Sequence, residues 1–301
     1  MESVSVIIVN WNTGKLLQEC LESLDKLPER SLIRLVVIVD NSSTDSSVSQ
    51  AQETADRAGF TILLQTENLG FAKANNIGIA YVQEHGGADD HILLLNPDTV
   101  VHPHAIEHMI SVLVSKDTIG IVGPKLLEAT GAVQPSVRSF PTLPVFMLLF
   151  LKLHRIFSNT ATWQKYILAD FDHTTQQSVD QVMGAAFLIR NTAMQAIGPL
   201  DEGFWIWFEE VDYCKRAKDA GFEILYTPSA TVTHHKGTSF NQLVGLKKTK
   251  PLLDSSLRYA KKHLGVRTYI VLCVLYPLAL LIALLASFDH ARQREQNSKK
   301  L

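Results

Sequence analysis

The chain is poor in cysteine and carries no strong excess of charge of either sign. Its three cysteines, Cys20, Cys214 and Cys273, are far apart, form no CxxC pair and follow no secretory signal. This pattern argues against a disulfide framework or a cysteine zinc site and favours a reducing compartment. The formal net charge is −2 over 301 residues, without a sustained basic stripe, so nothing indicates a nucleic-acid partner.

Two glycine-rich nucleotide-binding signatures are also missing. No GxGxxG follows the first apolar run, and no GxxxxGK followed by Ser or Thr occurs anywhere. These absences exclude the dinucleotide fingerprint and the Walker loop as the basis of a nucleotide site.

Apolar runs alternate with helical patterns through the first half of the chain. Short polar connections join them, which is typical of an α/β fold with a Rossmann-like, mostly parallel sheet flanked by helices. The five predicted strands are Val4 to Val9, Leu35 to Val39, Thr61 to Leu64, Ile92 to Leu95 and Ile119 to Val122.

Polar clusters follow the carboxyl ends of the first four predicted strands. In a parallel sheet these ends lie along one edge, which is where open α/β folds bind their ligands. The sequence therefore predicts a nucleotide-sized cleft at that edge. The clusters are Asn10 to Asn12, Asp40 to Ser43, Asn68 to Gly70 and Asn96 to Asp98.

Asp98 is the most informative of these polar residues, because an apolar strand leads directly into Asn96-Pro97-Asp98. Pro97 ends the ladder pairing, which puts the carboxylate at the edge of the sheet. A carboxylate there suits a divalent cation that holds a diphosphate. The alternative is an N-cap for a helix that begins near Pro103, and the sequence leaves both interpretations open.

Carboxylates and aromatic rings are concentrated in one short segment of the second half. Glu209, Glu210 and Asp212 follow four large rings, and a carboxylate beside such rings can have a raised pKa and act as a general base. The competing interpretation is acidic residues in the first turn of a helix, stabilised by the helix dipole. The density of rings favours an aromatic platform, which includes Trp205 and Trp207, for a sugar or an apolar acceptor.

Further candidates come from predicted strands on either side of this segment. Val182 to Arg190 contains Gly184 and Ala185, which are small enough for a ligand to approach the backbone. His234 and His235 follow short strands at Phe222 to Tyr226 and Ala230 to Thr233, and one histidine could join Asp98 as a metal ligand. Adjacent strand residues face opposite ways, so only one of the two is expected to do so.

A loop with small residues follows the two histidines. Gly237 and Ser239 indicate a flexible segment that would order over bound phosphates.

Two apolar stretches depart from the composition of a soluble protein. Tyr269 to Phe288 contains no charged residue and is long enough to cross about 30 Å of hydrocarbon, so it predicts a membrane segment. Pro277 also permits a kinked or re-entrant element. Phe146 to Leu151, with basic residues close by, fits either an interfacial segment or a buried helix.

Together these motifs resemble glycosyltransferase family 2, and most closely its rhamnosyltransferase-like branch, which builds bacterial surface polysaccharides. The resemblance implies a GT-A fold, a nucleotide-sugar donor, a divalent metal ion (Mg²⁺ or Mn²⁺) and inversion at the anomeric carbon. The motifs occur in order: Ser5 to Asn12, Val39 to Asp45, Glu67 to Asn76, Leu95 to Asp98, Phe208 to Asp212 and His234 to Ser239.

The resemblance also implies roles for particular residues. Asp98 is the expected metal ligand, and His234 the histidine that joins it. Glu210 is the expected base, with Glu209 and Asp212 as alternatives. Acceptor contacts are expected from Gly184, Ala185, Trp205 and Trp207. Donor contacts, in which Asp40 reads the pyrimidine imide, are expected from Asn10, Asn12, Asp40, Asn41, Asn68, Gly70, Phe71, Asn75 and Asn96.

The expected organisation is a nucleotide-sugar-binding half at 1–125, an acceptor-binding and catalytic half at 126–245, and a helical membrane-associated tail at 246–301. The expected reaction moves L-rhamnose from dTDP-rhamnose to a lipid-linked saccharide at the cytoplasmic face of the bacterial inner membrane. Alternatives are a UDP-hexose, UDP-galactofuranose or UDP-N-acetylhexosamine donor, or a non-catalytic GT-A scaffold that binds a nucleotide.

Overall fold

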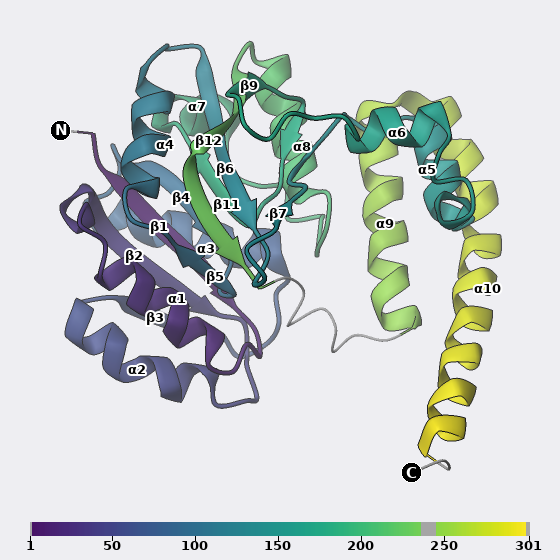
Figure 1. Cartoon of the computed structure of the whole chain (residues 1–301), viewed down its shortest axis with the longest axis horizontal. Helices are drawn as coiled ribbons and strands as arrows, with labels where there is room; N and C mark the ends of the chain where they lie inside the picture. The colour runs from purple at the N-terminus through teal and green to yellow at the C-terminus, as the bar shows by residue number, and fades with distance from the viewer. Residues whose placement is uncertain (1, 236–244, 299–301) are drawn as a thin grey trace.

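Strands with apolar side chains on both faces form the centre of the molecule. The computed structural model describes residues 2–235 and 245–298. Within them, eight strands of a ten-stranded sheet follow the path β3-β2-β1-β4-β11-β6-β12-β5 (Figure 1). The other two lie off this path, where β7 pairs with β6 and β9 with β12. Its strands are β1 (Val4–Asn10), β2 (Ile33–Asp40), β3 (Thr61–Leu64), β4 (His91–Leu95), β5 (Thr99–Val101), β6 (Ile119–Leu127), β7 (Val133–Gln134), β9 (Gln177–Ser178), β11 (Ala186–Ile189) and β12 (Glu223–His234). A second sheet pairs β8 (Val137–Arg138) with β10 (Gln181–Val182).

Helices cover both faces of the main sheet, because alternate residues of each central strand point to opposite sides. In β1, Val6 and Ile8 pack towards helices α1, α2 and α4, whereas Ile7 and Val9 pack towards α3, α7 and α8. These helices are α1 (Leu16–Asp25), α2 (Ser47–Ala58), α3 (Phe71–Glu84), α4 (Ala105–Val114), α7 (Asn191–Ile197) and α8 (Glu209–Asp219).

The pairing directions confirm the mostly parallel sheet predicted for the first half. β1 runs parallel to both β2 and β4, and β2 runs parallel to β3, so their carboxyl ends share one edge. β11 lies antiparallel between β4 and β6. Two strand predictions were wrong in detail: the strand predicted at Val182 to Arg190 is interrupted between β10 and β11, and the two short strands predicted near the end are the single strand β12.

The chain crosses the sheet edge at Asn96-Pro97-Asp98. β4 ends at Leu95, and β5 begins at Thr99 at the far end of the sheet order, where it pairs with β12. The N-cap interpretation of Asp98 was wrong, because α4 begins at Ala105 and the residue before it makes no side-chain cap. Asp98 is instead a buried carboxylate at the carboxyl edge.

A helical block stands beside the sheet (Figure 1). Its core joins side chains from α5, α9 and α10 to rings from the segment before α8, including Phe204 and Phe208. Phe146 and Phe150 are buried in this core, so the buried-helix interpretation of that segment holds for α5. The block contains α5 (Leu143–Phe150), α6 (Ala161–Ile167), α9 (Leu246–His263) and α10 (Gly265–Ser298).

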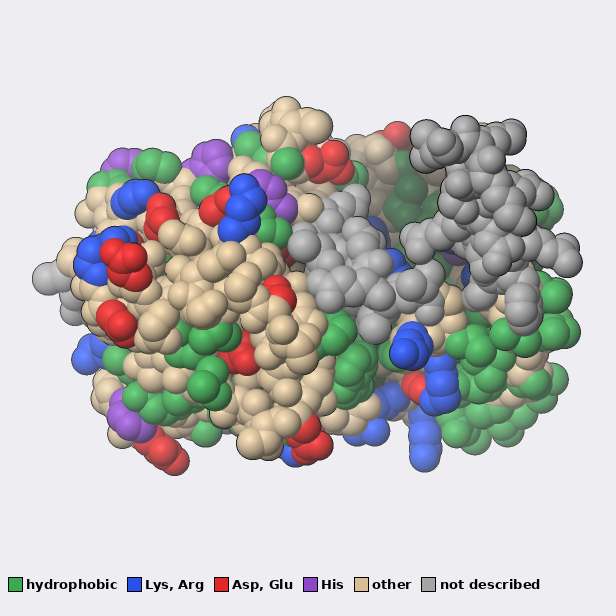
Figure 2. All heavy atoms as spheres, turned by 90° about the horizontal axis from the view of Figure 1, so that it is seen from below, with side chains coloured by type: hydrophobic (Ala, Val, Ile, Leu, Met, Phe, Trp, Pro, Cys, Tyr) green, Lys and Arg blue, Asp and Glu red, His purple; other side chains and the backbone are tan. Residues whose placement is uncertain are grey.

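One face of α10 is apolar and uncovered. The segment Gly265–Leu285 is 21 residues long and apolar enough to cross a membrane. Only 17% of an 18-residue stretch within it is buried inside the molecule. Figure 2 shows hydrophobic side chains gathered over this part of the molecule. The exposed apolar stripe of α10 comprises Val266, Ile270, Val274, Leu278, Leu281 and Leu285.

Asn10 holds the ends of β1 and β2 together. Its buried side-chain NH₂ donates to the Asp40 carboxylate over 2.8 Å and to the Ser47 hydroxyl over 2.9 Å. Its side-chain carbonyl oxygen accepts a hydrogen bond from the Thr13 hydroxyl. Its amide also donates to Ser43 over 3.1 Å. Asn10 is thus the centre of a hydrogen-bond network beneath the sheet edge.

We expect Asn10→Ala to lower the free energy of unfolding by about 3 kcal/mol, because it leaves several buried polar groups without their partner. Urea unfolding followed by circular dichroism measures the change. Asn159→Ala, at an exposed loop position, is the matched control and should change stability little. An equal effect of the two substitutions would contradict this role.

Candidate active site

A cavity of about 460 Å³ opens at the carboxyl edge of the sheet, between the strand ends and the segment that precedes α8. It collects side chains from both halves of the chain. The predicted site residues that line it are Asn41, Asn68, Gly70, Phe71, Asn96, Asp98, Gly184, Ala185, Trp205, Trp207, Glu209, Glu210 and His234.

Two asparagines and a tryptophan build one wall. The Asn41 side chain donates to Asn68 over 3.0 Å and accepts from the Leu69 N–H over 2.8 Å, which fixes the loop before α3. Gly70 has φ +83°, and a Cβ there would lie 2.4 Å from the Trp205 backbone oxygen. Only glycine lets this loop pack so closely against the Trp205 segment.

Four predicted donor-binding residues do not line the cavity. Asn10 lies in the network described above, and the Asp40 carboxylate accepts from Asn10 and from the Ser43 N–H over 3.0 Å. The Asn12 side chain accepts from the Thr44 N–H. Asn75 is buried, and its amide donates to the Phe71 carbonyl.

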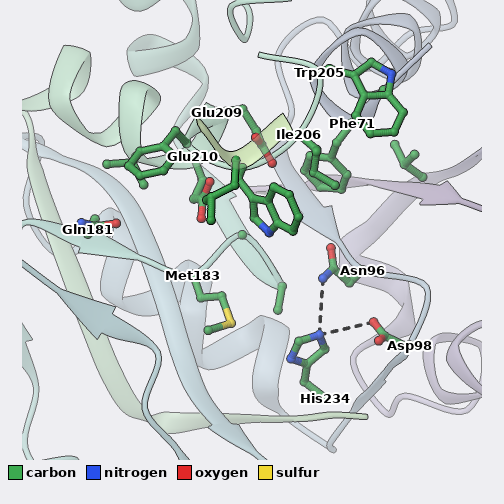
Figure 3. Close-up of a pocket in the computed structure, with 18 of the residues that line it drawn as sticks. Phe71, Asn96, Asp98, Gln181, Met183, Trp205, Ile206, Glu209, Glu210 and His234 are labelled. Atoms are coloured by element: carbon green, nitrogen blue, oxygen red, sulfur yellow. Dashed lines mark hydrogen bonds and ion pairs between the residues drawn. The ribbon is translucent and has the colours of Figure 1, made fainter. Parts of the chain in front are cut away.

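Asp98 and His234 face one another on the opposite wall (Figure 3). His234 Nδ1 lies 3.1 Å from the Gln134 side-chain oxygen, and Asn96 Nδ2 lies 3.4 Å from His234 Nε2. These side chains hold the ring so that His234 Nε2 faces Asp98 Oδ1 over 3.4 Å.

This arrangement fits a divalent cation. An imidazole nitrogen and a carboxylate oxygen are both ligands that divalent cations accept, and Gln134 orients the ring as the partners of metal-binding histidines do. No group of three or more His, Cys, Asp or Glu side chains in the described ranges could hold a metal. Asp98 and His234 would therefore need further ligands from a bound diphosphate and water. The predicted phosphate-covering loop at Gly237 and Ser239 lies outside the described residues.

Glu209 and Glu210 lie across the cavity from that pair (Figure 3). Burial, and then repulsion from Glu210, raise the pKa of Glu209 well above its ordinary value. Burial also raises the pKa of Glu210, against the opposing effects of backbone N–H groups and the charge of Arg138. One carboxylate oxygen of each is buried and has no hydrogen-bond partner among the residues that the structure describes.

Asp212 differs from the other two carboxylates. It does not line the cavity, and its buried side chain pairs with Arg216, Lys262 and His263 over 2.7 to 2.8 Å. Burial alone would raise its pKa, but these partners outweigh burial and lower it. Asp212 therefore ties α8 to α9.

The four rings before Glu209 divide between core and cavity. Phe204 and Phe208 belong to the helical block's core, so core packing accounts for half of the ring density. Trp205 and Trp207 line the cavity, with Trp205 38% exposed. Trp207 and Phe208 have φ of +61° and +70°, a conformation that costs bulky residues about 1–3 kcal/mol each and is concentrated at functional sites.

Several lining residues were not predicted from the sequence. They lie on two-residue strands, directly beside such strands, or in the helical block, where no motif marks them. They include Ser136, Arg138, Leu149, Tyr166, Gln181, Met183 and Leu252.

Comparison with known proteins shows which family the chain belongs to. A family model described as "Glycosyltransferase like family 2" matches residues 2–248. The chain belongs to glycosyltransferase family 2. The chain is therefore a glycosyltransferase, and its curated relatives put it in the rhamnosyltransferase-like branch.

Two of those relatives are named rhamnosyltransferases. The N-acetylglucosaminyl-diphospho-decaprenol L-rhamnosyltransferase of Mycobacterium tuberculosis is 30% identical over 78% of this chain and 76% of its own length. Rhamnosyltransferase WbbL of Escherichia coli K12 is 27% identical over 79% of this chain and 86% of its own.

Solved structures confirm the GT-A fold. GalNAc-T7 with UDP, GalNAc and Mn²⁺ matches with a TM-score of 0.58 and 16% identity, over 77% of this chain and 43% of that one. The mannosyltransferase PcManGT of Pyrobaculum calidifontis, with GDP-Man and Mn²⁺, matches with a TM-score of 0.56 and 15% identity, over 96% of this chain and 75% of that one.

We expect Glu209→Gln to stabilise the glycosyltransferase at pH 8. The pKa of Glu209 is higher in the folded state than in the unfolded chain, so its ionisation destabilises the fold as pH rises above the ordinary glutamate pKa, about 4.3. The gain should shrink as pH is lowered towards that value. Thermal unfolding between pH 5 and 8 measures it.

Asp212→Asn is the matched control, because its folded-state pKa is shifted the other way. It should destabilise the protein at pH 8 by about 3 kcal/mol, since removing one partner leaves buried charges unpaired. A pH-independent gain from Glu209→Gln, or a loss at pH 8, would contradict the raised pKa.

Proposed function

We propose that this glycosyltransferase moves L-rhamnose from dTDP-rhamnose to a saccharide carried on a lipid diphosphate, with inversion, in bacterial cell-surface polysaccharide biosynthesis. One observation carries the proposal. Two carboxylates of raised pKa, Glu209 and Glu210, and a pair suited to a cation, Asp98 and His234, lie on opposite walls of one cavity. The named activities of the two curated rhamnosyltransferases support the choice of sugar and acceptor.

Asp98 and His234 would hold a Mg²⁺ or Mn²⁺ ion. When bound, such an ion neutralises the charge that develops on a nucleoside diphosphate leaving group. The Gln134 side-chain oxygen lies 3.1 Å from His234 Nδ1 and orients the ring so that Nε2 faces Asp98. The Mn²⁺ ions named with the two structural neighbours support this assignment.

Glu210 is the proposed base. Its carboxylate lines the cavity and has an oxygen without a hydrogen-bond partner, so it can accept the proton of an acceptor hydroxyl. The hydroxyl oxygen then attacks the anomeric carbon as the bond to the diphosphate breaks on the far side, which inverts the configuration. Burial raises the pKa of Glu210, which makes its carboxylate a stronger base.

The donor would lie along the strand ends of residues 1–125, and the acceptor against residues 126–245. Asn41, Asn68 and Phe71 line the donor side of the cavity, with Asp40 behind them. A Cβ added to Gly184 would lie 3.5 Å from Glu210 Cβ, an ordinary packing distance, so Gly184 packs directly beside the proposed base. Trp205 and Trp207 offer ring faces to the acceptor sugar.

The tail at 246–301 would hold the enzyme on the cytoplasmic face of the inner membrane without crossing it. Tyr276, near the middle of the apolar length of α10, donates to Asp254 of α9, and Asp254 pairs with Lys250 over 2.6 Å. A spanning α10 would take these charges into hydrocarbon, which is costly. An α10 that lies in the interface keeps them in water and turns its exposed stripe to the lipid.

We expect Glu210→Gln to lower kcat at least 100-fold, because general-base catalysis contributes about that factor or more. The assay supplies dTDP-rhamnose, Mn²⁺ and N-acetylglucosamine linked through a diphosphate to a short polyprenyl chain, and detects the product by mass spectrometry. Asp98→Ala should abolish transfer and also weaken Mn²⁺-dependent binding of dTDP, whereas Glu210→Gln should retain that binding.

The same assay with UDP-hexoses, UDP-galactofuranose and UDP-N-acetylhexosamine tests the donor. Preference for one of these would replace the rhamnose assignment while keeping the enzyme class. Full transfer by Glu210→Gln would exclude Glu210 as the base. Binding of every nucleotide without transfer of any sugar would support a non-catalytic scaffold.

We expect alkaline carbonate to release the protein from membranes, because α10 lies in the interface. Leu278→Glu should weaken binding to vesicles of anionic lipid several-fold, since it puts a charge into the apolar stripe. Leu64→Glu is the matched control, at an exposed leucine of β3 outside the helical block. Retention in the carbonate pellet would contradict the interfacial placement.

A further inference from the structure

Arg138 brings a positive charge to the wall of the cavity. It is half-buried on β8, and no hydrogen bond or ion pair joins its guanidinium to another side chain in the described part of the chain. Burial raises the pKa of both Glu210 and Tyr166, and the nearby charge of Arg138 opposes this rise. A half-buried arginine facing a cavity is suited to bind an anion that enters from outside.

A second polar group close by in sequence is also unsatisfied. Ser136 is 5% exposed, lines the same cavity, and has a hydroxyl without a hydrogen-bond partner in the described structure. The Met183 N–H donates to the Ser136 carbonyl over 2.8 Å, which fixes the backbone there. A buried hydroxyl without a partner is costly, so it indicates a ligand that supplies one.

The surroundings of Arg138 differ from those of Asp98. Tyr166 of α6 lies beside Arg138. The backbone carbonyl of Tyr166 accepts a hydrogen bond from the Ser139 N–H over 3.0 Å. Leu149 of α5 and Leu252 of α9 line the cavity from the helical block that carries the apolar stripe of α10. An acceptor that arrives from a membrane bound to that stripe would therefore approach along the helical block and past Arg138.

We propose that Arg138 and Ser136 form a second anion-binding subsite, which takes the diphosphate of the lipid-linked acceptor. The proposal rests on the function proposed above and specifies how its acceptor is recognised. The guanidinium makes paired hydrogen bonds to phosphate oxygens, and the Ser136 hydroxyl donates one more. The sugar on this diphosphate then reaches Glu210, while its lipid chain follows the apolar side chains towards α10.

Two other roles for Arg138, tuning the pKa of Glu210 or binding the donor, would have different consequences. If Arg138 served only to lower the pKa of Glu210, its removal would slow transfer to every acceptor alike and shift the pH profile. If it held the donor diphosphate, its removal would weaken binding of dTDP. An acceptor subsite instead makes Arg138 discriminate between acceptors with and without a diphosphate.

The test compares two probes that carry the same N-acetylglucosamine and the same phenoxyundecyl chain, one joined through a diphosphate and the other through a neutral ether. Binding to the full-length protein in detergent is measured by calorimetry without donor. We expect the wild type to bind the diphosphate probe at least tenfold more tightly than the neutral probe. Arg138→Met should abolish most of this preference, and Ser136→Ala should reduce it several-fold.

Arg57→Met is the matched control, because Arg57 forms an exposed surface pair with Asp25 over 3.1 Å, and it should keep the full preference. Equal binding of the two probes by the wild type would overturn the subsite, as would an unchanged preference in Arg138→Met. Weakened dTDP binding in Arg138→Met, or equal slowing of transfer to both acceptors with the preference intact, would also overturn it. Diphosphate-selective binding without any transfer would leave the subsite standing and refute the proposed donor.

Discussion

The parallel pairing of β1 with β2 and β4 is the constraint on which the rest of the structure depends. These strands are apolar on both faces, so they can be stable only in the middle of a covered sheet, and polar residues are confined to their ends. Parallel alignment brings these ends to one edge, and the Asn10 network locks two of them together. The cavity is the space that this edge and the segment before α8 enclose.

Charge is distributed unevenly across that space, and this distribution organises the chemistry. Asp98 and His234 on one wall face each other over 3.4 Å, with an oxygen and a nitrogen that can both bind a cation. Glu209 and Glu210 on the other wall are buried among rings, which favours their protonated forms and makes Glu210 a competent proton acceptor. Arg138 adds a positive charge on the side nearest the helical block. A donor with a diphosphate and an acceptor with a diphosphate can thus be held at separate places around one reacting carbon.

The sequence predicted the strands well because their apolar runs are long and bounded by polar clusters. The grouping of Asp98, His234 and Glu210 at one site was predicted from the family motifs. It could not separate Asn10, which the fold buries in a network, from Asn41, which lines the cavity. Gln134 and Arg138 were missed because they lie on two-residue strands, whose side-chain directions are set by pairing with β6 and β10. The role of Asp212 depends on His263 of α9, a contact between distant segments that no local pattern encodes.

A crystal structure with Mn²⁺ and a non-hydrolysable dTDP-rhamnose analogue tests the central claim most directly, because anomalous scattering locates the metal independently of the protein. The account predicts one Mn²⁺ bound by Asp98 Oδ1, His234 Nε2 and the donor diphosphate, with the anomeric carbon facing Glu210. A metal bound elsewhere, or a sugar whose anomeric carbon faces away from Glu210, would contradict it.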